Sequence, residues 1–186
     1  MNFVQPIRDK NKLEEIKEEL KKTGTRDYMM FYTGINTGLR ISDLLKLNRD
    51  DVRNLDGSMK SHISIIEKKT KKPKKFPIVN GLFVELDKYT RNMQIGEYLF
   101  QSQKGINKPI SASQAYRIIS SAATNVGLTE IGTHTMRKTF GYHHYQQYHD
   151  IAILQEIFNH SSPSITLRYI GISQDEIDKS YYNFSL

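Results

Sequence analysis

The stretch THTMRKTFGYHHYQQYHDIAILQEIFNHSSPSITLRYI, residues 133–170, decides the fold because local signals mark its helix boundaries. Asp150 is a favourable N-cap between two helical segments, and Ser162-Pro163 combines an N-cap with proline at the first helical position. Gly171 follows as a stop signal. The stretch therefore predicts three consecutive helices, at 135–148, at 151–158 and from 163 to about 170.

Helical patterns also dominate the chain outside this stretch. Leu13, Ile16 and Leu20 recur at helical spacing among charged residues, which is typical of an amphipathic surface helix. Gly38 is placed to end a more buried helix in the left-handed conformation. Together with two capping boxes, these signals predict further helices at 11–22, 26–37 and 42–47, one opened by Ser111 with Gln114 and ended at Gly127, and a short one opened by Ser173 with Glu176.

Two short apolar runs in the middle of the chain predict the only sheet. Ser61 to Glu67 alternates around two isoleucines, and Phe76 to Val79 gives a second run after a turn-like segment that contains Pro73. Such runs joined by a turn indicate a small β-hairpin. We expect a mainly α fold with a small antiparallel sheet (α+β), in a single domain.

Composition narrows the function classes. The 186 residues suffice for one domain, and 38% hydrophobic with 25% charged residues is typical of a globular protein. The chain has no cysteine, no long apolar stretch and no apolar run near its first residues, which favours a cytoplasmic protein. Lys and Arg (27) exceed Asp and Glu (20), so the net charge of +7 favours an anionic partner, with nucleic acid as the leading candidate.

Two segments of the first half place cations at turns. Thr37-Gly38-Leu39-Arg40 sets an arginine between two helices, and Asp43, three residues on, is positioned to hold its guanidinium. A surface Arg–Asp pair has the same pattern. Six of the eight residues from Lys68 to Lys75 are lysine, which suits a hairpin tip that enters a phosphate-lined groove. A charge run that protects a sheet edge is the alternative.

Two segments of the second half add titratable groups. His134 and Arg137 are three residues apart near a predicted helix start, so both side chains face one side where anions are favoured. Chance or capping explains such a pair as well. His160 follows one predicted helix, and Tyr169 lies nine residues later in the last turn of the next. With 11 tyrosines in the chain, a core role for Tyr169 is the alternative.

Taken in order, these segments resemble the tyrosine recombinase (phage integrase) family over nearly the whole chain. By its motifs, Arg40 is similar to the family's first arginine, His134 and Arg137 to its HxxR box, His160 to its second histidine and Tyr169 to its nucleophile. Lys69 best fits the family's hairpin lysine, with Lys68 and Lys71 as alternatives. By their spacing alone, Ser42 and Asp43 are placed to orient Arg40. From the basic hairpin segment we expect DNA-binding lysines at Lys68, Lys71, Lys72, Lys74 and Lys75.

The resemblance implies the DNA breaking-rejoining fold and a site-specific recombinase that acts on double-stranded DNA. The tyrosine attacks a phosphodiester and forms a 3′-phosphotyrosyl intermediate, with neither metal nor ATP, and four protomers assemble on two duplexes. Two departures from the family stand out: Phe158-Asn159 replaces the usual Leu-Gly before His160, and Lys138 stands where a second histidine often follows the HxxR arginine. Because only 39 residues precede Arg40, we expect residues 1–186 to be one catalytic domain without the usual N-terminal core-binding domain, bacterial or phage-encoded. The Met1 start favours a stand-alone protein over a fragment.

Three alternatives remain at this stage. A non-catalytic regulator whose helices between Asp150 and Ile170 form a helix-turn-helix-like unit would explain the charge. A metal-dependent nuclease would use His143, His144 and His149, which lack the i, i+4 spacing of a helical zinc pair. The third alternative keeps the fold but relaxes DNA as a type IB topoisomerase does, or only regulates.

Overall fold

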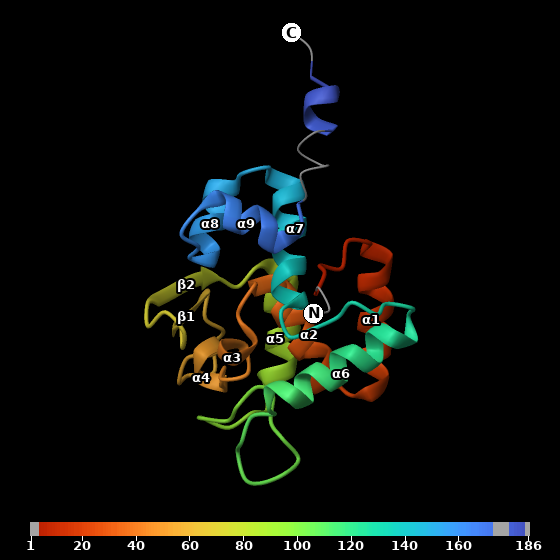
Figure 1. Cartoon of the computed structure of the whole chain (residues 1–186). Helices are drawn as coiled ribbons and strands as arrows, with labels where there is room; N and C mark the ends of the chain where they lie inside the picture. Colours follow the sequence, from red (N-terminus) through yellow and green to blue (C-terminus); the bar gives the residue numbers. More distant parts are fainter. Residues whose placement is uncertain (1–3, 173–178, 185–186) are drawn as a thin grey trace.

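The structure is a computed structural model that describes residues 4–172 and 179–184. It is mainly helical with one two-stranded sheet (Figure 1). The capping box predicted at Ser173 and Glu176 lies outside the described residues. The elements are α1 (Lys10–Thr23), α2 (Thr25–Thr37), α3 (Ile41–Leu44), α4 (Arg49–Val52), β1 (His62–Ile66), β2 (Pro73–Pro77), α5 (Asn80–Thr90), α6 (Ala112–Asn125), α7 (Thr135–Tyr148), α8 (Ile151–Phe158) and α9 (Pro163–Ile170).

The main body is a bundle in which α2 contacts α1, α5 and α7. Its core is one cluster of buried apolar side chains, with Leu20 from α1, Phe31 from α2, Leu86 from α5, Ile119 from α6 and Met136 from α7. Burial of each such side chain stabilises the fold by about 1.5–3 kcal/mol before the entropy of ordering is subtracted. This core fixes α2 and the first half of α7, the two helices that lead to the candidate site.

A second, smaller core lies at the other end of α7. Leu154, Phe158 and Ile170 are fully buried there, so α8 and α9 pack as a pair against the second half of α7. Figure 1 shows this C-terminal helix pair stacked on the main body, with α7 running through both. At Gly141 a Cβ atom would lie 2.7 Å from side-chain atoms of both Phe158 and Ile170, so only glycine allows this close approach.

The hairpin is a two-stranded antiparallel sheet beside the C-terminal helix pair (Figure 1). Ile63 pairs with Phe76 and is fully buried in the main core, which anchors the hairpin. Pro73 is the first residue of β2 rather than part of the turn, a position that proline tolerates because the strand start lacks a required donor. Lys71, with φ of 58°, makes the left-handed residue of the turn.

Most predicted boundaries are confirmed. The helices at 135–148, 151–158 and 163–170 have those bounds, and Gly38 and Gly171 end their helices in the left-handed conformation. The short helix expected at 42–47 is instead α3, one turn long, and α4 and α5 were not predicted. Across the described ranges, every helix falls short of the length and apolar character that a bilayer span requires.

Candidate active site

The candidate residues meet where the C-terminal helix pair contacts the hairpin and the start of α7, a region called the junction below. Arg40 comes from the link between α2 and α3, and Arg137 from the first turn of α7. His160 follows α8 directly, and Tyr169 lies in the last turn of α9. Residues that are far apart in the sequence therefore converge, as the order of motifs predicted.

Tyr169 is surrounded by the two histidines and Arg137. Its hydroxyl oxygen is 3.3 Å from Nδ1 of His134, and its ring centroid is 5.2 Å from that of His160 in an edge arrangement. Burial raises the pKa of the Tyr169 phenol, while the charges of Arg137 and Arg40 and a hydrogen bond with Arg137 act in the opposite direction. The phenol is thus protonated at neutral pH, with an imidazole beside its proton.

Arg137 is buried and held by backbone carbonyls at fixed positions. Its Nη1 donates to the carbonyl of Gly38 at 2.6 Å, and its Nη2 donates to the carbonyl of Phe158 at 2.9 Å. Gly38 has φ of 60°, and a Cβ there would lie 2.5 Å from the Phe140 ring, so the turn requires glycine. The Phe158 carbonyl belongs to the end of α8, where the helix dipole is negative and favours a cation.

Arg40 takes its carboxylate partner from the hairpin. Its Nη1 lies 2.6 Å from Oε1 of Glu67, and its Nη2 is 3.5 Å from the Phe158 carbonyl. The predicted pair between Arg40 and Asp43 is wrong for the described residues. Asp43 Oδ1 instead accepts from the backbone N–H of Lys68 at 2.9 Å. Ser42 is half-buried in the single turn of α3. Asp43 thus acts on the hairpin turn instead of on the guanidinium.

Both histidines are held in the neutral form. Burial, followed by the charges of Arg137 and Arg40, lowers the pKa of His160 to about 4. Burial and the same arginines also lower the pKa of His134, in this case with Lys138 contributing. Nδ1 of His160 lies 3.0 Å from the Thr166 hydroxyl, which fixes the ring orientation. A neutral imidazole beside the phenol has the protonation state of a base.

The lysines of the hairpin divide into two groups. Lys69 is exposed, and its charge is the smallest of the effects that lower the pKa of both His134 and His160. Lys74 donates to the Ile157 carbonyl at 3.0 Å and Lys72 to Oδ1 of Asn159 at 3.2 Å, so both point toward the end of α8. Burial lowers the pKa of Lys74 to about 8, with Arg137 contributing. The other lysines proposed to bind DNA, Lys68, Lys71 and Lys75, are exposed.

Two residues at the junction were not identified from the sequence. Glu67 is 2% exposed and pairs with Arg40. Lys138 has its Nζ 5.3 Å from the centroid of the Tyr169 ring, within cation–π range. Their sequence signals were available: Glu67 borders the lysine run, and Lys138 follows the HxxR arginine.

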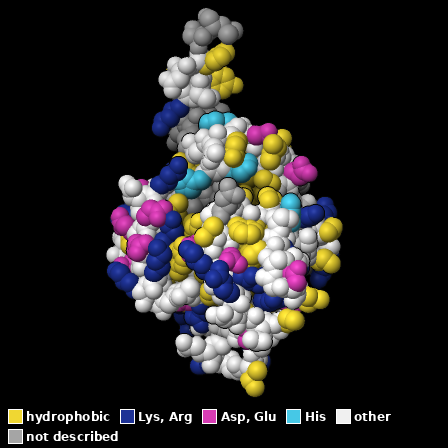
Figure 2. Space-filling view, turned by 180° about the vertical axis from the view of Figure 1, so that it is seen from behind, with side chains coloured by type: hydrophobic (Ala, Val, Ile, Leu, Met, Phe, Trp, Pro, Cys, Tyr) yellow, Lys and Arg dark blue, Asp and Glu magenta, His cyan; other side chains and the backbone are white. Residues whose placement is uncertain are grey.

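The surface around these residues is basic and hollowed. Figure 2 shows a face on which Lys and Arg side chains gather near the centre, with His side chains above them. A groove of about 890 Å³ separates the hairpin from α7 and α8, and its lining includes Glu67, Lys74 and Asn159. Lys72, Lys75, Asp150 and Glu156 also line this groove, together with apolar side chains. None of the five candidate catalytic residues Arg40, His134, Arg137, His160 and Tyr169 lines it, so the groove lies beside the junction.

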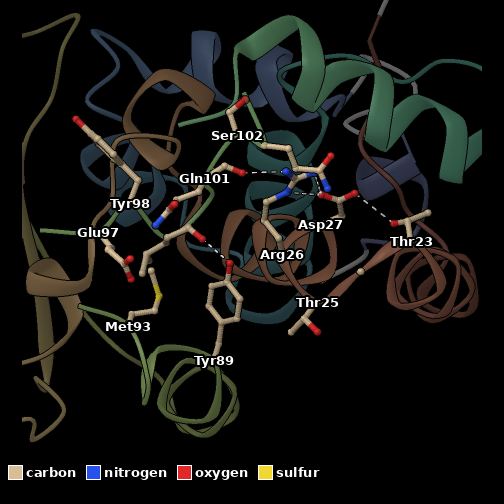
Figure 3. Close-up of a pocket in the computed structure, with 13 residues that line it drawn as sticks. Thr23, Thr25, Arg26, Asp27, Tyr89, Met93, Glu97, Tyr98, Gln101 and Ser102 are labelled. Atoms are coloured by element: carbon tan, nitrogen blue, oxygen red, sulfur yellow. Dashed lines mark hydrogen bonds and ion pairs between the residues drawn. The ribbon is translucent and has the colours of Figure 1, made fainter. Parts of the chain in front are cut away.

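A separate cavity of about 500 Å³ lies at the start of α2 and the end of α5 (Figure 3). Three of its polar side chains, those of Arg26, Asp27 and Tyr89, are paired within the protein. Arg26 binds Asp27 and the carbonyl of Gln101, and the Tyr89 hydroxyl donates to the carbonyl of Leu99. None of the residues that the motifs singled out lines this cavity.

The three histidines of the metal alternative do not converge. His143 Nε2 contacts the carbonyl of Ile7, His144 packs between Phe140 and Tyr148, and His149 is the left-handed cap of α7. Within the described ranges, no group of three or more His, Cys, Asp or Glu side chains is arranged to hold a metal ion. The geometry of these histidines thus gives a metal-dependent nuclease no support.

Comparisons with known proteins agree with this geometry. The model of the phage integrase family matches residues 8–176. A probable integrase/recombinase of Bacillus subtilis (strain 168), YoeC, is 52% identical over 184 residues, which cover 99% of this chain and 98% of the relative. The tyrosine recombinase XerC of Thermodesulfovibrio yellowstonii is 30% identical over 186 residues, which cover 94% of this chain but 60% of the relative.

Solved structures share the fold at lower identity. The crystal structure of XerA recombinase aligns with a TM-score of 0.76 at 20% identity, over 98% of this chain and 66% of that one. XerH site-specific recombinase, in a post-cleavage complex with a palindromic difH substrate, aligns with a TM-score of 0.68 at 20% identity, over 98% and 54%. The chain thus spans about half to two thirds of these longer recombinases. On its motifs, fold and relatives, this chain belongs to the phage integrase family, the tyrosine recombinases.

Proposed function

We propose that this protein is a site-specific recombinase that breaks and rejoins duplex DNA, with Tyr169 as the nucleophile. The observation that carries the proposal is the position of the Tyr169 hydroxyl, 3.3 Å from Nδ1 of a neutral His134, with the charge of Arg137 acting on the phenol. A phenol, a base and two permanently charged guanidiniums that meet at the junction are the groups that phosphoryl transfer to a tyrosine requires.

In the first step, the Tyr169 oxygen attacks a DNA phosphorus, and the bond from phosphorus to the 5′-oxygen breaks. A phenol has an ordinary pKa of about 10, so its proton must leave during attack. His134 accepts that proton at Nδ1, in the tautomer that carries its own proton on Nε2. Lys69 supplies a proton to the departing 5′-oxygen, with Lys68 and Lys71 as the alternatives. The products are a 3′-phosphotyrosyl protein and a free 5′-hydroxyl.

In the second step, a 5′-hydroxyl of another strand attacks the phosphotyrosyl bond and releases Tyr169. One phosphate ester is exchanged for another in each step, so the bond energy is retained and the proposed reaction consumes neither ATP nor a metal-activated water. Arg40 and Arg137 stabilise the charge on the non-bridging oxygens through their planar N–H groups, and His160 donates a further hydrogen bond. Ser42 and Asp43 support this site through α3 and the hairpin turn.

We also propose double-stranded DNA as the partner, bound mainly through its phosphates. The hairpin lysines place cations beside the junction: Lys68, Lys71, Lys72 and Lys75 are exposed, and Lys74 is half-buried. The net charge of +7 supports the same partner, as does the structural likeness to XerH, which was crystallised with its difH substrate. Because bacterial DNA lies in the cytoplasm, we place the activity there.

The active assembly is proposed to be a tetramer on two duplexes, as the family implies. Tyr181, Tyr182 and Phe184 are 75%, 88% and 68% exposed, and they lie in a segment that projects from the body (Figure 1). Exposed aromatic side chains of this kind suit docking onto a neighbouring copy. We treat residues 1–186 as one catalytic domain in this assembly.

A suicide substrate tests the proposed activity. This duplex carries a nick close to the scissile phosphate, so that the short product diffuses away and the covalent adduct accumulates. Because the target sequence is not known, the duplexes are taken from the DNA that flanks the gene. We expect an adduct that resists denaturant and EDTA, is lost in Tyr169→Phe and persists in Tyr181→Phe. Equal binding of Tyr169→Phe and the unaltered protein, with no adduct from either, would instead favour the non-catalytic regulator.

A further inference from the structure

Glu67 is a buried carboxylate that contacts the phosphate-binding arginine and the lysine turn at the same time. Its Oε1 lies 2.6 Å from Nη1 of Arg40, and its Oε2 accepts from the Thr70 hydroxyl at 2.7 Å. The side chain is 2% exposed, whereas the ion pairs of α1 lie on the surface. Glu67 directly follows β1, and its two partners lie apart: Arg40 precedes α3, and Thr70 lies in the hairpin turn three residues after Glu67.

The backbone of Glu67 also closes that turn. Its N–H donates to the Lys72 carbonyl at 3.0 Å, and its carbonyl accepts from the Lys71 N–H at 2.9 Å. Lys69, the candidate acid for the leaving oxygen, lies inside the loop that these bonds close. Glu67 therefore contacts both the Lys69 turn and the Arg40 guanidinium, whereas Asp43 contacts the turn only, through the Lys68 N–H.

Glu67 is surrounded by cations. The charges of Arg40 and Lys74 both lower its pKa, and Arg137 in turn interacts electrostatically with Glu67, Arg40 and Lys74. Thr70, Arg40 and Lys74 together lower the pKa of the Glu67 carboxyl, against the effect of burial, so it remains ionised at neutral pH. Without that negative charge, neighbouring cations would repel each other at short distance, and Arg40 would have no carboxylate to fix its direction.

We propose that Glu67 is a positioning residue that holds Arg40 and the Lys69 turn as one unit. The guanidinium that meets the non-bridging oxygens and the ammonium that meets the leaving 5′-oxygen then keep a fixed separation. Glu67 itself does not contact the DNA, since its two oxygens are occupied by Arg40 and Thr70. Arg40 has further N–H groups for a phosphate beyond the one directed at Glu67. This inference rests on the proposed function, because it assigns Arg40 and Lys69 to the two ends of one reaction.

A change of leaving group distinguishes the effect of Glu67 on the Lys69 turn from its effect on Arg40. The cleavage rate is measured in single turnover on the suicide duplex, and on the same duplex with sulfur in place of the scissile 5′-bridging oxygen. A thiolate leaves without protonation, so this substrate needs no acid. Two reference variants give the limits of the comparison. The cleavage rate of Lys69→Ala should be restored by the sulfur substrate, and that of Arg40→Ala should not.

We expect Glu67→Ala to slow cleavage of the oxygen substrate by about 100-fold, the order of loss that a misplacement of about 1 Å produces. The sulfur substrate should raise the rate of this variant about tenfold, because it removes the need for the acid Lys69 but not the need for a correctly placed Arg40. Thr70→Val removes the turn contact alone, so it should lose about threefold to tenfold, and sulfur should restore all of it. Glu67→Gln keeps the shape but not the charge, and its loss should lie between the two. DNA affinity should change less than twofold in each variant.

Glu85→Ala, which removes a half-buried carboxylate paired with Lys88 outside the junction, is the matched control and should leave both rates unchanged. If Glu67→Ala does not fold, Glu67→Gln and Thr70→Val carry the same comparison. The proposed link would be overturned by two results together. Glu67→Ala or Glu67→Gln would slow cleavage equally on both substrates, and Thr70→Val would show no loss of rate that sulfur restores. If the unaltered protein forms no Tyr169 adduct on either duplex, the proposed function fails first, and this outcome is distinct.

Discussion

Nδ1 of His134 lies 3.3 Å from the hydroxyl of Tyr169, although 35 positions separate these residues in the sequence. The contact joins the start of α7 to the end of α9, and the two rings meet edge to face with centroids 6.2 Å apart. The nucleophile and its candidate base are thus provided by one chain. Each protomer contains a complete set of the proposed catalytic groups.

The first prediction is that cleavage occurs in cis. A mixture of Tyr169→Phe, which lacks the nucleophile, with Arg137→Ala, which lacks a phosphate ligand, should form no more covalent adduct than either variant alone. The measurement is adduct formation on the suicide duplex at equal total protein, with each variant mixed with unaltered protein as the control. Recovery of adduct in the mixture of the two variants would show that Tyr169 reaches a neighbour's site.

The second prediction concerns the two arginines. Arg40→Ala and Arg137→Ala should each slow cleavage by about 10²–10³-fold, because each removes a preorganised donor to the transition-state charge. Arg137→Lys should restore little, since an ammonium cannot reproduce the paired bonds to Gly38 and Phe158.

The control for the arginines is Arg117→Ala, which removes the same charge from the exposed side of α6. It should leave the single-turnover rate unchanged. A near-normal rate in Arg40→Ala or Arg137→Ala would contradict the placement of that residue at the phosphate.

The third prediction concerns pH. His134 acts as a base only when it is neutral, and burial with the nearby cations lowers its pKa below the ordinary 6.5. The value of kcat/KM, which reports the free protein, should therefore stay high near pH 6.5 and fall only as the pH drops through that lowered pKa. His134→Gln should remove this acidic limb and reduce the rate by about 10²-fold or more. An acidic limb that persists in His134→Gln would assign it to another group.

The fourth prediction uses two neighbouring lysines as a matched pair. Lys75 is exposed, whereas Lys74 donates to the Ile157 carbonyl. In a plot of log K for DNA binding against log salt concentration, Lys75→Ala should reduce the slope by about 0.9, the value for one lost phosphate contact. Lys74→Ala should change that slope by less than half as much. Equal changes in slope would show that Lys74 turns outward to a phosphate when DNA binds.

Local signals predicted the helix boundaries of the second half because capping depends on a few adjacent residues. The side chain of Asp150 accepts from Ile153 N–H and that of Ser162 from Ile165 N–H, as their residue types suggested. By contrast, α5 begins after Val79 without any side-chain cap and is stabilised by burial of Leu82 and Leu86 in the main core, which no short window of sequence shows. α4 does have a local signal, the capping box of Asn48 with Asp51, but the helix spans only four residues.

The partner of Arg40 could not be predicted for a related reason. Asp43 is the nearest acid that follows Arg40 in the sequence. A spacing of three residues places two side chains on the same face only if both residues lie in one helix. Arg40 instead has extended backbone angles, φ −66° and ψ 144°, and precedes α3. Its side chain therefore leaves in another direction and meets Glu67, 27 positions away on the hairpin. The residue types of the site followed from the family motifs, but this pairing depends on how the hairpin packs.

The most direct test of the account is identification of the residue that becomes bound to DNA. The adduct from the suicide duplex is digested with protease and nuclease, and the modified peptide is located by mass spectrometry. The chain has 11 tyrosines, so the result discriminates among many phenols. We predict a single phosphonucleotide-bearing peptide with the modification on Tyr169. Modification of any other residue, or strand cleavage without a protein–DNA bond, would contradict the central claim.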